Sequence, residues 1–278
     1  MITELRYQVR DTVRPLAEKC GLSVLHEFAD IVVIAWLFFT ALQVGISPTI
    51  SRVVFPVSYG KANKRTRRNW DVHVVSLVHA LIAVVLASWC LQAKSLNDDR
   101  AFGTYPDASF LLAIAVGYFI WDALESIIHF SEVGFVLHGK QSTTFLRPFV
   151  HYYAVRFLLW EVSTIFLNIN WFLDKMGKTG SQLQFVNGIA LLGSFFCVRL
   201  VWGGIMSYGF FVTLNGVYTQ LPLFYIMVYG VTNLTLHGLN WFWFMKMIGA
   251  LRRRFAGKSV KDKPMNGNGT SKIESCLD

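Results

Sequence analysis

The sequence predicts an all-α, polytopic transmembrane helical bundle. Only 15% of its residues are charged and 54% are hydrophobic, whereas about 25% are charged in an average soluble domain. Its apolar stretches approach the roughly 20 residues that a helix needs to cross a bilayer. Ionisable and amide side chains are set inside these stretches. Because a charged group in lipid is costly, such side chains are expected to face a bundle interior, a cavity or one another.

The chain divides into segments by composition. Residues 1–23 form an amphipathic N-terminal lead-in, without the short apolar core of a cleavable signal peptide. Residues 24–69 hold the first span and a basic linker, and 70–248 form the main helical domain. The basic tail, 249–278, is rich in Lys, Gly, Asn and Ser and is expected to be disordered. The clear apolar spans are 24–45, 71–93, 108–129, 149–173, 185–212 and 219–248.

Clustered positive charge sets the expected topology. The linker carries Arg52, Lys61, Lys64, Arg65, Arg67 and Arg68, and the tail carries Arg252, Arg253, Arg254, Lys258, Lys261, Lys263 and Lys272. The positive-inside rule places both groups in the cytosol, but with six spans five crossings lie between the linker and the tail, which would put the tail outside. A seventh, marginal span at 131–147 removes the conflict. We therefore expect seven spans, with the N-terminus outside and the C-terminus cytosolic, and no glycan on the sequon that begins at Asn268.

Several functional classes lack their signatures. The four cysteines, Cys20, Cys90, Cys197 and Cys276, form no paired metal motif or disulfide framework. The seven histidines do not cluster as in membrane di-iron enzymes, so no metal is expected. Phosphate-binding glycine loops are absent, so no cofactor is expected. The basic segments have no accompanying nucleic-acid reading element, which makes membrane lipids the expected partners, with a homo-oligomer also possible.

Two motifs place polar side chains on one helix face. Ser76 and His79 are three residues apart, which favours either a hydrogen-bonded histidine lining a cavity or a structural His–Ser contact between helices. A second stripe, with spacings of three, four and seven, consists of Asp122, Glu125, Ser126 and His129. There a carboxylate could orient an imidazole that acts as a base, or Asp122 could pair with Arg156 or Arg199 from a neighbouring span.

Two further segments add candidates. Glu161, Thr164 and Asn168 share a face about a turn and a half beyond Arg156, which indicates a polar ladder between packed helices or a head-group site. His138 lies in the marginal span and is the main candidate for a catalytic base. The adjacent glycine would allow close approach of a ligand, and Lys140 could attract phosphate or pair with an acidic residue.

The chain resembles the TLC-domain family, which includes ceramide synthases and translocating-chain-associated proteins. Three motifs carry the resemblance: V-S-L-V-H-A ending at Ala80, G-Y-F-I-W-D ending at Asp122, and E-V-S-T-I-F-L-N-I-N-W-F beginning at Glu161. The set looks most like the small fungal and animal members. The resemblance implies that 70–248 is a TLC domain, in which six spans enclose a tunnel for an acyl chain, in the endoplasmic-reticulum membrane.

The departures from the family pattern favour lipid binding over the acyltransferase activity of ceramide synthases. Ceramide synthases carry a histidine pair followed by an aspartate-rich stretch, where this chain has His138-Gly139 and no acid in residues 139–160. Ile165 also replaces a proline of the family motif. We therefore expect a lipid-binding protein of lipid homeostasis, whose head-group site includes Asp122, His79 and His138.

The alternative is a sphingoid-base N-acyltransferase that uses acyl-CoA, with His138 as general base oriented by Asp122. The lipid- or head-group-binding set expected in either case is His79, Ser76, Glu125, His129, Lys140, Arg156, Glu161 and Asn168. A structural partner of the translocation machinery is a third possibility.

Overall fold

The computed structural model describes residues 2–19, 25–129 and 149–261, and these residues form helices joined by turns. No strand occurs in these three ranges. The elements are α1 (Ile2–Lys19), α2 (Leu25–Ala41), η1 (Leu42–Ile46), α3 (Ser47–Val54), α4 (Lys64–Cys90), α5 (Lys94–Asp98), α6 (Pro106–Ile128), α8 (His151–Leu158), α9 (Glu161–Lys175), α10 (Gln182–Ser194), η3 (Phe195–Trp202), α11 (Gly203–Gly216), η4 (Tyr218–Gln220) and α12 (Leu223–Lys261). The helix α12 thus continues past residue 249, where the sequence predicted a disordered tail. Residues 262–278 lie outside the described chain.

Two of the long rods contain a π-helical segment. The first rod, α2–η1–α3, is continuous from residue 25 to 54, with η1 in its middle and Pro48 in the first turn of α3. The second rod, α10–η3–α11, runs from residue 182 to 216 and includes η3. A π segment changes the direction of the side chains that follow it and is frequent at functional sites.

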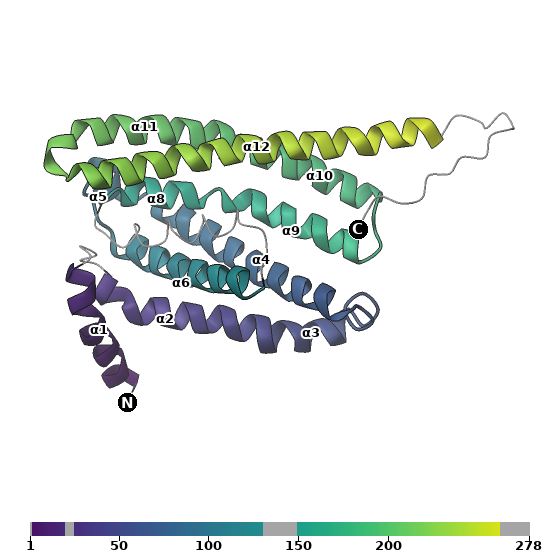
Figure 1. Ribbon diagram of the computed structural model, residues 1–278, viewed down its shortest axis with the longest axis horizontal. Coiled ribbons are helices and arrows are strands. Elements are labelled where there is room, and N and C mark those ends of the chain that lie inside the picture. Colours follow the sequence, from purple (N-terminus) through teal and green to yellow (C-terminus); the bar gives the residue numbers. More distant parts are fainter. Residues whose placement is uncertain (1, 20–24, 130–148, 262–278) are drawn as a thin grey trace, which may run out of the picture.

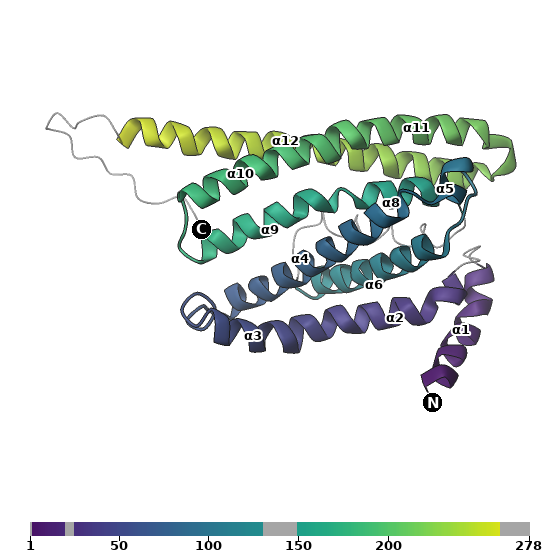
Figure 2. The ribbon, with the colours of Figure 1, turned by 180° about the vertical axis from the view of Figure 1, so that it is seen from behind.

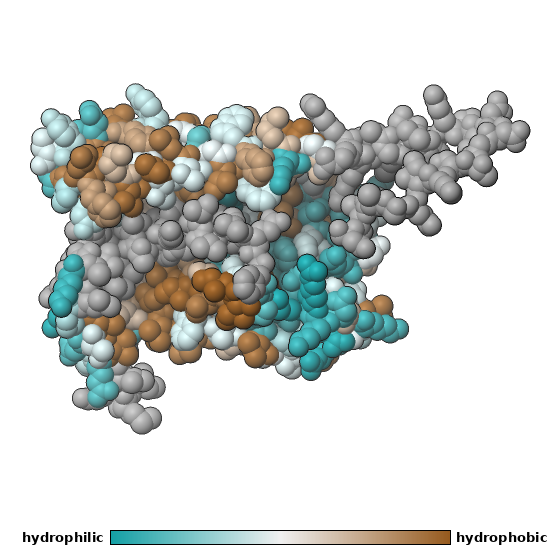
Figure 3. Space-filling model, in the orientation of Figure 1, coloured by the Kyte–Doolittle hydropathy of each residue, from teal (hydrophilic) through white to brown (hydrophobic). Residues whose placement is uncertain are grey.

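Among the described residues, four helical stretches are long and apolar enough to cross a membrane: 26–54, 64–90, 106–128 and 182–216. Many large apolar side chains on these stretches are exposed, including Val44, Val85 and Ile205, which are 72%, 66% and 57% exposed. Figure 3 shows brown apolar surface over the sides of the bundle. These features are those of a multi-pass membrane protein. The predicted spans 149–173 and 219–248 are helical but are not among these long apolar stretches. The first is divided into two shorter helices, α8 and α9, and contains Arg156 and Glu161.

The helices pack side by side in a layered order. The pairs α2 with α6, α4 with α9, α9 with α10, and α12 with η3 and α11 lie in contact (Figures 1 and 2). Gly117 of α6 allows a close approach to α2, because a side-chain carbon there would lie 2.6 Å from the Cβ atom of Ala35. The marginal span 131–147 lies outside the described residues. The end of α6 and the start of α8, which flank it, lie at opposite ends of the bundle (Figure 1).

One end of the bundle carries the basic linker. There α3 ends, residues 55–63 turn, and α4 begins with Asn63 as N-cap, whose Oδ1 atom accepts from the amide of Thr66 at 2.8 Å. Figure 3 shows teal hydrophilic surface gathered at this end. The turn between α9 and α10 and the far end of α12 lie at the same end (Figure 1). The linker is therefore part of a polar face, whereas the sides of the bundle are apolar.

Candidate functional site

A polar cluster inside the bundle is organised by Asn168 of α9. Its Oδ1 atom lies 2.7 Å from Nδ1 of His73, and its Nδ2 atom donates to Ser76 Oγ at 3.1 Å. The same amide also donates to the carbonyl of Thr164 at 3.0 Å. Asn168 is 1% exposed, and amide side chains that bridge helices in this way stabilise their packing. Ser76 and Asn168, predicted on separate helices, therefore meet in space.

His79 lies next to this cluster but is enclosed by aromatic rings. Its imidazole stacks on Tyr118 with centroids 3.7 Å apart, and the rings of Phe39 and Phe119 contact it edge-on. Neither ring nitrogen has a hydrogen-bond partner in the described chain. Both predicted alternatives for His79 are wrong: its ring accepts or donates no hydrogen bond in the described chain, and the Ser76 hydroxyl bonds Tyr118 and Asn168 instead. The two residues do share a face, but His79 is directed into the aromatic layer.

Asp122 and Glu161 bring two carboxylates near each other across α6 and α9. The two groups interact electrostatically, and Asp122 has no hydrogen bond or ion pair with any residue that the structure describes. Glu161 bonds Thr164 and interacts with Arg199. The predicted alternative in which Asp122 pairs with Arg156 or Arg199 is wrong, because neither guanidinium forms an ion pair with it. An acidic side chain without a partner at this depth is costly, so it is a candidate for ligand recognition.

Arg199 supplies the cation of this interior cluster, and it lies in the π segment η3. Its Nε atom donates to Ser163 Oγ at 2.8 Å, and Nη2 donates to Thr164 Oγ1 at 3.1 Å. Its Nη1 atom lies 3.4 Å from the side-chain oxygen of Asn240 on α12. Arg199 was predicted only as a possible partner of Asp122. The signal that could have identified it is a lone cation inside the apolar span 185–212.

Arg156 lies apart from this cluster and forms hydrogen bonds and a cation–π contact that hold helices together. Its Nη2 atom donates to Asn97 Oδ1 at 2.7 Å, Nη1 donates to the carbonyl of Tyr152 at 3.0 Å, and the guanidinium lies 3.4 Å from the centre of the Tyr152 ring. These bonds join α8 to the polar segment around α5. The assignment of Arg156 to a head-group site together with Asp122 is therefore not supported by its position.

Glu125 and His129 are also separated from the interior. Glu125 Oε1 lies 2.6 Å from Arg68 Nε, and Glu125 Oε2 lies 3.3 Å from His129 Nδ1. The predicted stripe therefore divides: Glu125 and His129 lie beside the basic linker, whereas Asp122 interacts electrostatically with Glu161 as well as with Glu125. The reason is that Glu125 and His129 lie at the end of α6, next to the linker, whereas Asp122 lies about one turn earlier in the helix.

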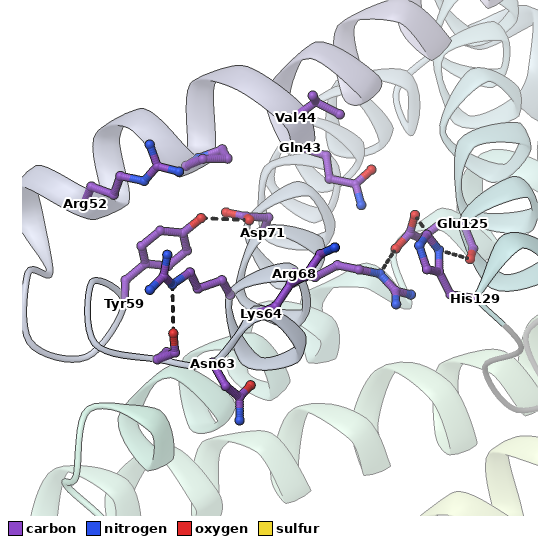
Figure 4. Close-up of a pocket in the computed structure, with 13 residues that line it drawn as sticks. Gln43, Val44, Arg52, Tyr59, Asn63, Lys64, Arg68, Asp71, Glu125 and His129 are labelled. Atoms are coloured by element: carbon purple, nitrogen blue, oxygen red, sulfur yellow. Dashed lines mark hydrogen bonds and ion pairs between the residues drawn. The ribbon is translucent and has the colours of Figure 1, made fainter.

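A cavity of about 680 Å³ lies at this end of the bundle. Figure 4 shows its walls, which come from η1, α3, the linker, the start of α4 and the end of α6. Its charged lining consists of Arg52, Lys64, Arg67, Arg68, Asp71 and Glu125, with His129 at one edge. Four cations thus face two carboxylates. From the sequence alone, these cations were expected to set the topology and to attract anionic lipid or CoA phosphates in a general way.

One wall of the cavity is held by buried hydrogen bonds to Asp71. Ser47 Oγ donates to Oδ1 of Asp71 at 2.6 Å, and the Tyr59 hydroxyl donates to Oδ2 at 2.9 Å. Burial, with the hydrogen bond to Asp71 and its negative charge, raises the pKa of Tyr59 to about 12. Arg67 fixes the linker itself, donating to the carbonyls of Ala62 and Gly60 at 2.8 and 2.9 Å. The linker is therefore ordered by the same residues that line the cavity.

Two predicted site residues, His138 and Lys140, lie outside the described residues. Within the described ranges, no group of three His, Cys, Asp or Glu side chains is arranged to hold a metal ion. The interior arrangement can accept hydrogen bonds from a ligand through Asp122 and Glu161. The cavity at the bundle end can bind an anion through its cations.

The sequence matches the family model of the TLC domain over residues 69–249. It is 35% identical over 263 residues to a TLC domain-containing protein of Schizosaccharomyces pombe, covering 92% of this chain and 90% of the relative. It is 31% identical to topoisomerase I damage affected protein 4 of Saccharomyces cerevisiae, covering 94% and 92%. It is 26% identical to TLC domain-containing protein 4-B of Danio rerio, covering 87% and 94%. No solved structure matches the chain.

Proposed function

Because the chain belongs to the TLC-domain family of membrane proteins, we propose that it binds a membrane lipid whose head group enters the polar interior. The family assignment confirms the resemblance to the small fungal and animal members. The observation that carries the proposal is Asp122, a carboxylate within a membrane-spanning helix that faces Glu161 and has no bonding partner in the described chain. A ligand with hydrogen-bond donors would compensate the free-energy cost of keeping the Asp122 carboxylate inside the membrane.

The chemistry of the cluster supports a lipid with hydroxyl or amine groups. Asp122 and Glu161 offer acceptor oxygens, and a protonated amine or a hydroxyl would be a suitable donor to them. Sphingoid bases carry both groups next to an alkyl chain, and N-acylated sphingolipids carry the hydroxyl and an amide N–H. The aromatic layer around His79 would then contact the apolar part. The protein would act in lipid homeostasis as a binder, a sensor or a carrier.

The direction of the helices supports the proposed topology. The basic linker, the turn holding Lys175 and Lys178, and the far end of α12 lie at one end of the bundle (Figure 1). The start of α8 lies at the opposite end from the finish of α6, which supports a seventh crossing between them. The positive-inside rule then places the linker and the C-terminus in the cytosol. We propose that six spans enclose an acyl-chain tunnel and that the membrane is that of the endoplasmic reticulum.

Lipids that remain bound through purification would test the proposal. The full chain is extracted in mild detergent, and its co-purified lipids are identified by native mass spectrometry. Asp122→Asn should lower the occupancy of an amine- or hydroxyl-bearing lipid about tenfold, the value expected for loss of one charge-assisted hydrogen bond. Asp98→Asn is the matched control, because Asp98 is an exposed acid on α5, away from the interior. Equal occupancy in both variants would remove Asp122 from the site.

The same preparation distinguishes the alternative activity. Incubation with acyl-CoA and a sphingoid base would yield an amide if the protein were an N-acyltransferase. Loss of that product in His138→Ala and in Asp122→Asn would replace the binding proposal with the enzymatic one. Bound lipid without turnover supports binding. Stable co-purification with translocation proteins, with no lipid retained, would instead favour a structural role.

A further inference from the structure

The cavity at the basic end of the bundle has the charge of an anion site. Its four cations exceed its two carboxylates by two, and its volume of about 680 Å³ falls within the roughly 300–1,000 Å³ typical of ligand pockets. Arg52 and Lys64 line it without an ion-pair partner anywhere in the described residues. Clustered cations repel one another, and an anionic ligand would relieve that repulsion.

The two carboxylates in the lining already accept side-chain hydrogen bonds. Arg52 interacts with Asp71 only electrostatically, so Arg52 and Lys64 keep their donors available for a ligand. Asp71 accepts hydrogen bonds on both oxygens, from Ser47 and Tyr59. Glu125 is bound between Arg68 and His129. Because these bonds are side chain to side chain and partly buried, they hold the walls in place before a ligand binds. Because these side chains are already held in place, less conformational entropy is lost when a ligand binds.

The surroundings of the cavity identify its ligand as a lipid. Val44 lines the cavity and is 72% exposed, and Val53 and Ile50 of α3 are 79% and 56% exposed on the same rod. These apolar side chains belong to the membrane-spanning stretch 26–54. The cavity therefore lies where the apolar surface ends and the basic linker begins, the level at which phospholipid head groups lie. A lipid could place its phosphates among the cations and its tails along α2 and α3.

We propose that this cavity binds a phospholipid whose head group carries more than one phosphate charge. Arg52 and Lys64 would contact the additional phosphate, and Arg68 would add a donor while it remains paired to Glu125. The site is separate from the interior cluster at Asp122, so this inference does not depend on the proposed lipid of the interior. It adds a second lipid class, selected by charge at the membrane surface.

Binding is measured on the full chain in phosphatidylcholine nanodiscs. The probe is a short-chain phosphatidylinositol bisphosphate, and the comparison probes are short-chain phosphatidylcholine and the soluble inositol trisphosphate. Replacing both free cations, Arg52→Gln with Lys64→Gln, should weaken binding of the bisphosphate lipid at least about tenfold, because charge-assisted hydrogen bonds are lost. The matched control is Lys61→Gln with Arg65→Gln, which removes two exposed cations of the same linker that do not line the cavity.

The outcomes separate the site from general surface charge. A loss confined to the cavity pair, with the control pair within about threefold of the parent, supports the proposal. An equal loss in both pairs would overturn it, since diffuse attraction would then explain binding. Binding of inositol trisphosphate as tight as that of the lipid would overturn the lipid assignment. No binding by the parent protein would also overturn it.

Two further variants test whether the glutamine pair still folds and whether the cavity binds independently of Asp122. The conservative Arg52→Lys variant keeps the charge and should retain most of the binding, which shows that a loss in the glutamine pair does not come from misfolding. Asp122→Asn should leave bisphosphate binding unchanged. If it does not, the two sites are coupled and the separate cavity site is wrong.

Discussion

The hydrogen bond between Tyr59 and Asp71 allows a quantitative test of how the basic linker is held. The two oxygens are 2.9 Å apart, and the residues are 2% and 6% exposed. Hydrogen bonds to charged groups contribute about 1.5–3 kcal/mol. Burial and this hydrogen bond together raise the pKa of Tyr59 from 10.0 to about 12. Because the adjoining cavity admits solvent, we expect Tyr59→Phe to lower the free energy of unfolding by about 1–2 kcal/mol at pH 7.

The same contact predicts a pH dependence with a definite sign. The pKa of Tyr59 is higher in the folded state, so folding favours the neutral phenol. The stabilisation is therefore complete below the ordinary pKa of 10.0 and is lost as the pH rises toward about 12. The difference in stability between the parent protein and Tyr59→Phe should shrink over that window.

Reversible unfolding in mixed detergent micelles, followed from pH 7 to pH 12, provides the measurement. The control is Tyr208→Phe, because Tyr208 is 75% exposed and has no hydrogen bond in the described chain. That variant should differ from the parent by less than about 0.5 kcal/mol. Equal stability of Tyr59→Phe and the parent at pH 7, or a difference that persists unchanged to pH 12, would refute the reasoning. In a double-mutant cycle with Ser47→Ala, the effects should couple by more than about 0.5 kcal/mol, because both hydroxyls serve the same carboxylate.

Three further outcomes follow from packing, charge and topology. Gly117→Ala should destabilise the α2–α6 contact by about 1–3 kcal/mol in the same unfolding assay, because its new carbon would lie 2.7 Å from a backbone carbonyl. Gly188→Ala, which meets no atom within 4 Å, should not be destabilising. A double-mutant cycle of Arg68→Gln and Glu125→Gln should give a coupling of about 1 kcal/mol for their partly buried ion pair, and zero coupling would contradict the geometry. Asn268 should remain free of glycan in secretory-pathway expression, and a mobility shift on deglycosylation would reverse the topology.

The helices were largely predictable because hydropathy is a local property of the chain. The apolar spans at 71–93 and 108–129 correspond to α4 and α6, which end within a few residues of the predicted limits. The break between α8 and α9 and the π segments η1 and η3 were not predicted. No short-range pattern marks a π segment, since the extra residue in the turn is stabilised by contacts with neighbouring helices. The length of α12 was also missed, because composition alone suggested disorder.

The candidate site was predictable only within single helices. Spacing placed Glu161, Thr164 and Asn168 on one face, and Asn168 indeed bonds to both α4 and the carbonyl of Thr164. Spacing also joined Asp122 to Glu125, but the second residue belongs to the basic end with Arg68. A helix stripe gives the direction of side chains on that helix and says nothing of what the neighbouring helix presents.

The sequence by itself determined that this is a helical membrane protein of the TLC-domain family, with polar side chains inside its spans and basic segments at defined positions. Hydropathy, charge and motif are properties of the order of residues, so they need no knowledge of neighbours. Only the tertiary structure decided that Arg199 approaches Glu161, that Arg156 bonds Asn97, and that the linker cations converge on one cavity. Such contacts depend on how far each helix is rotated and where it crosses the next, and packing of the whole bundle fixes both.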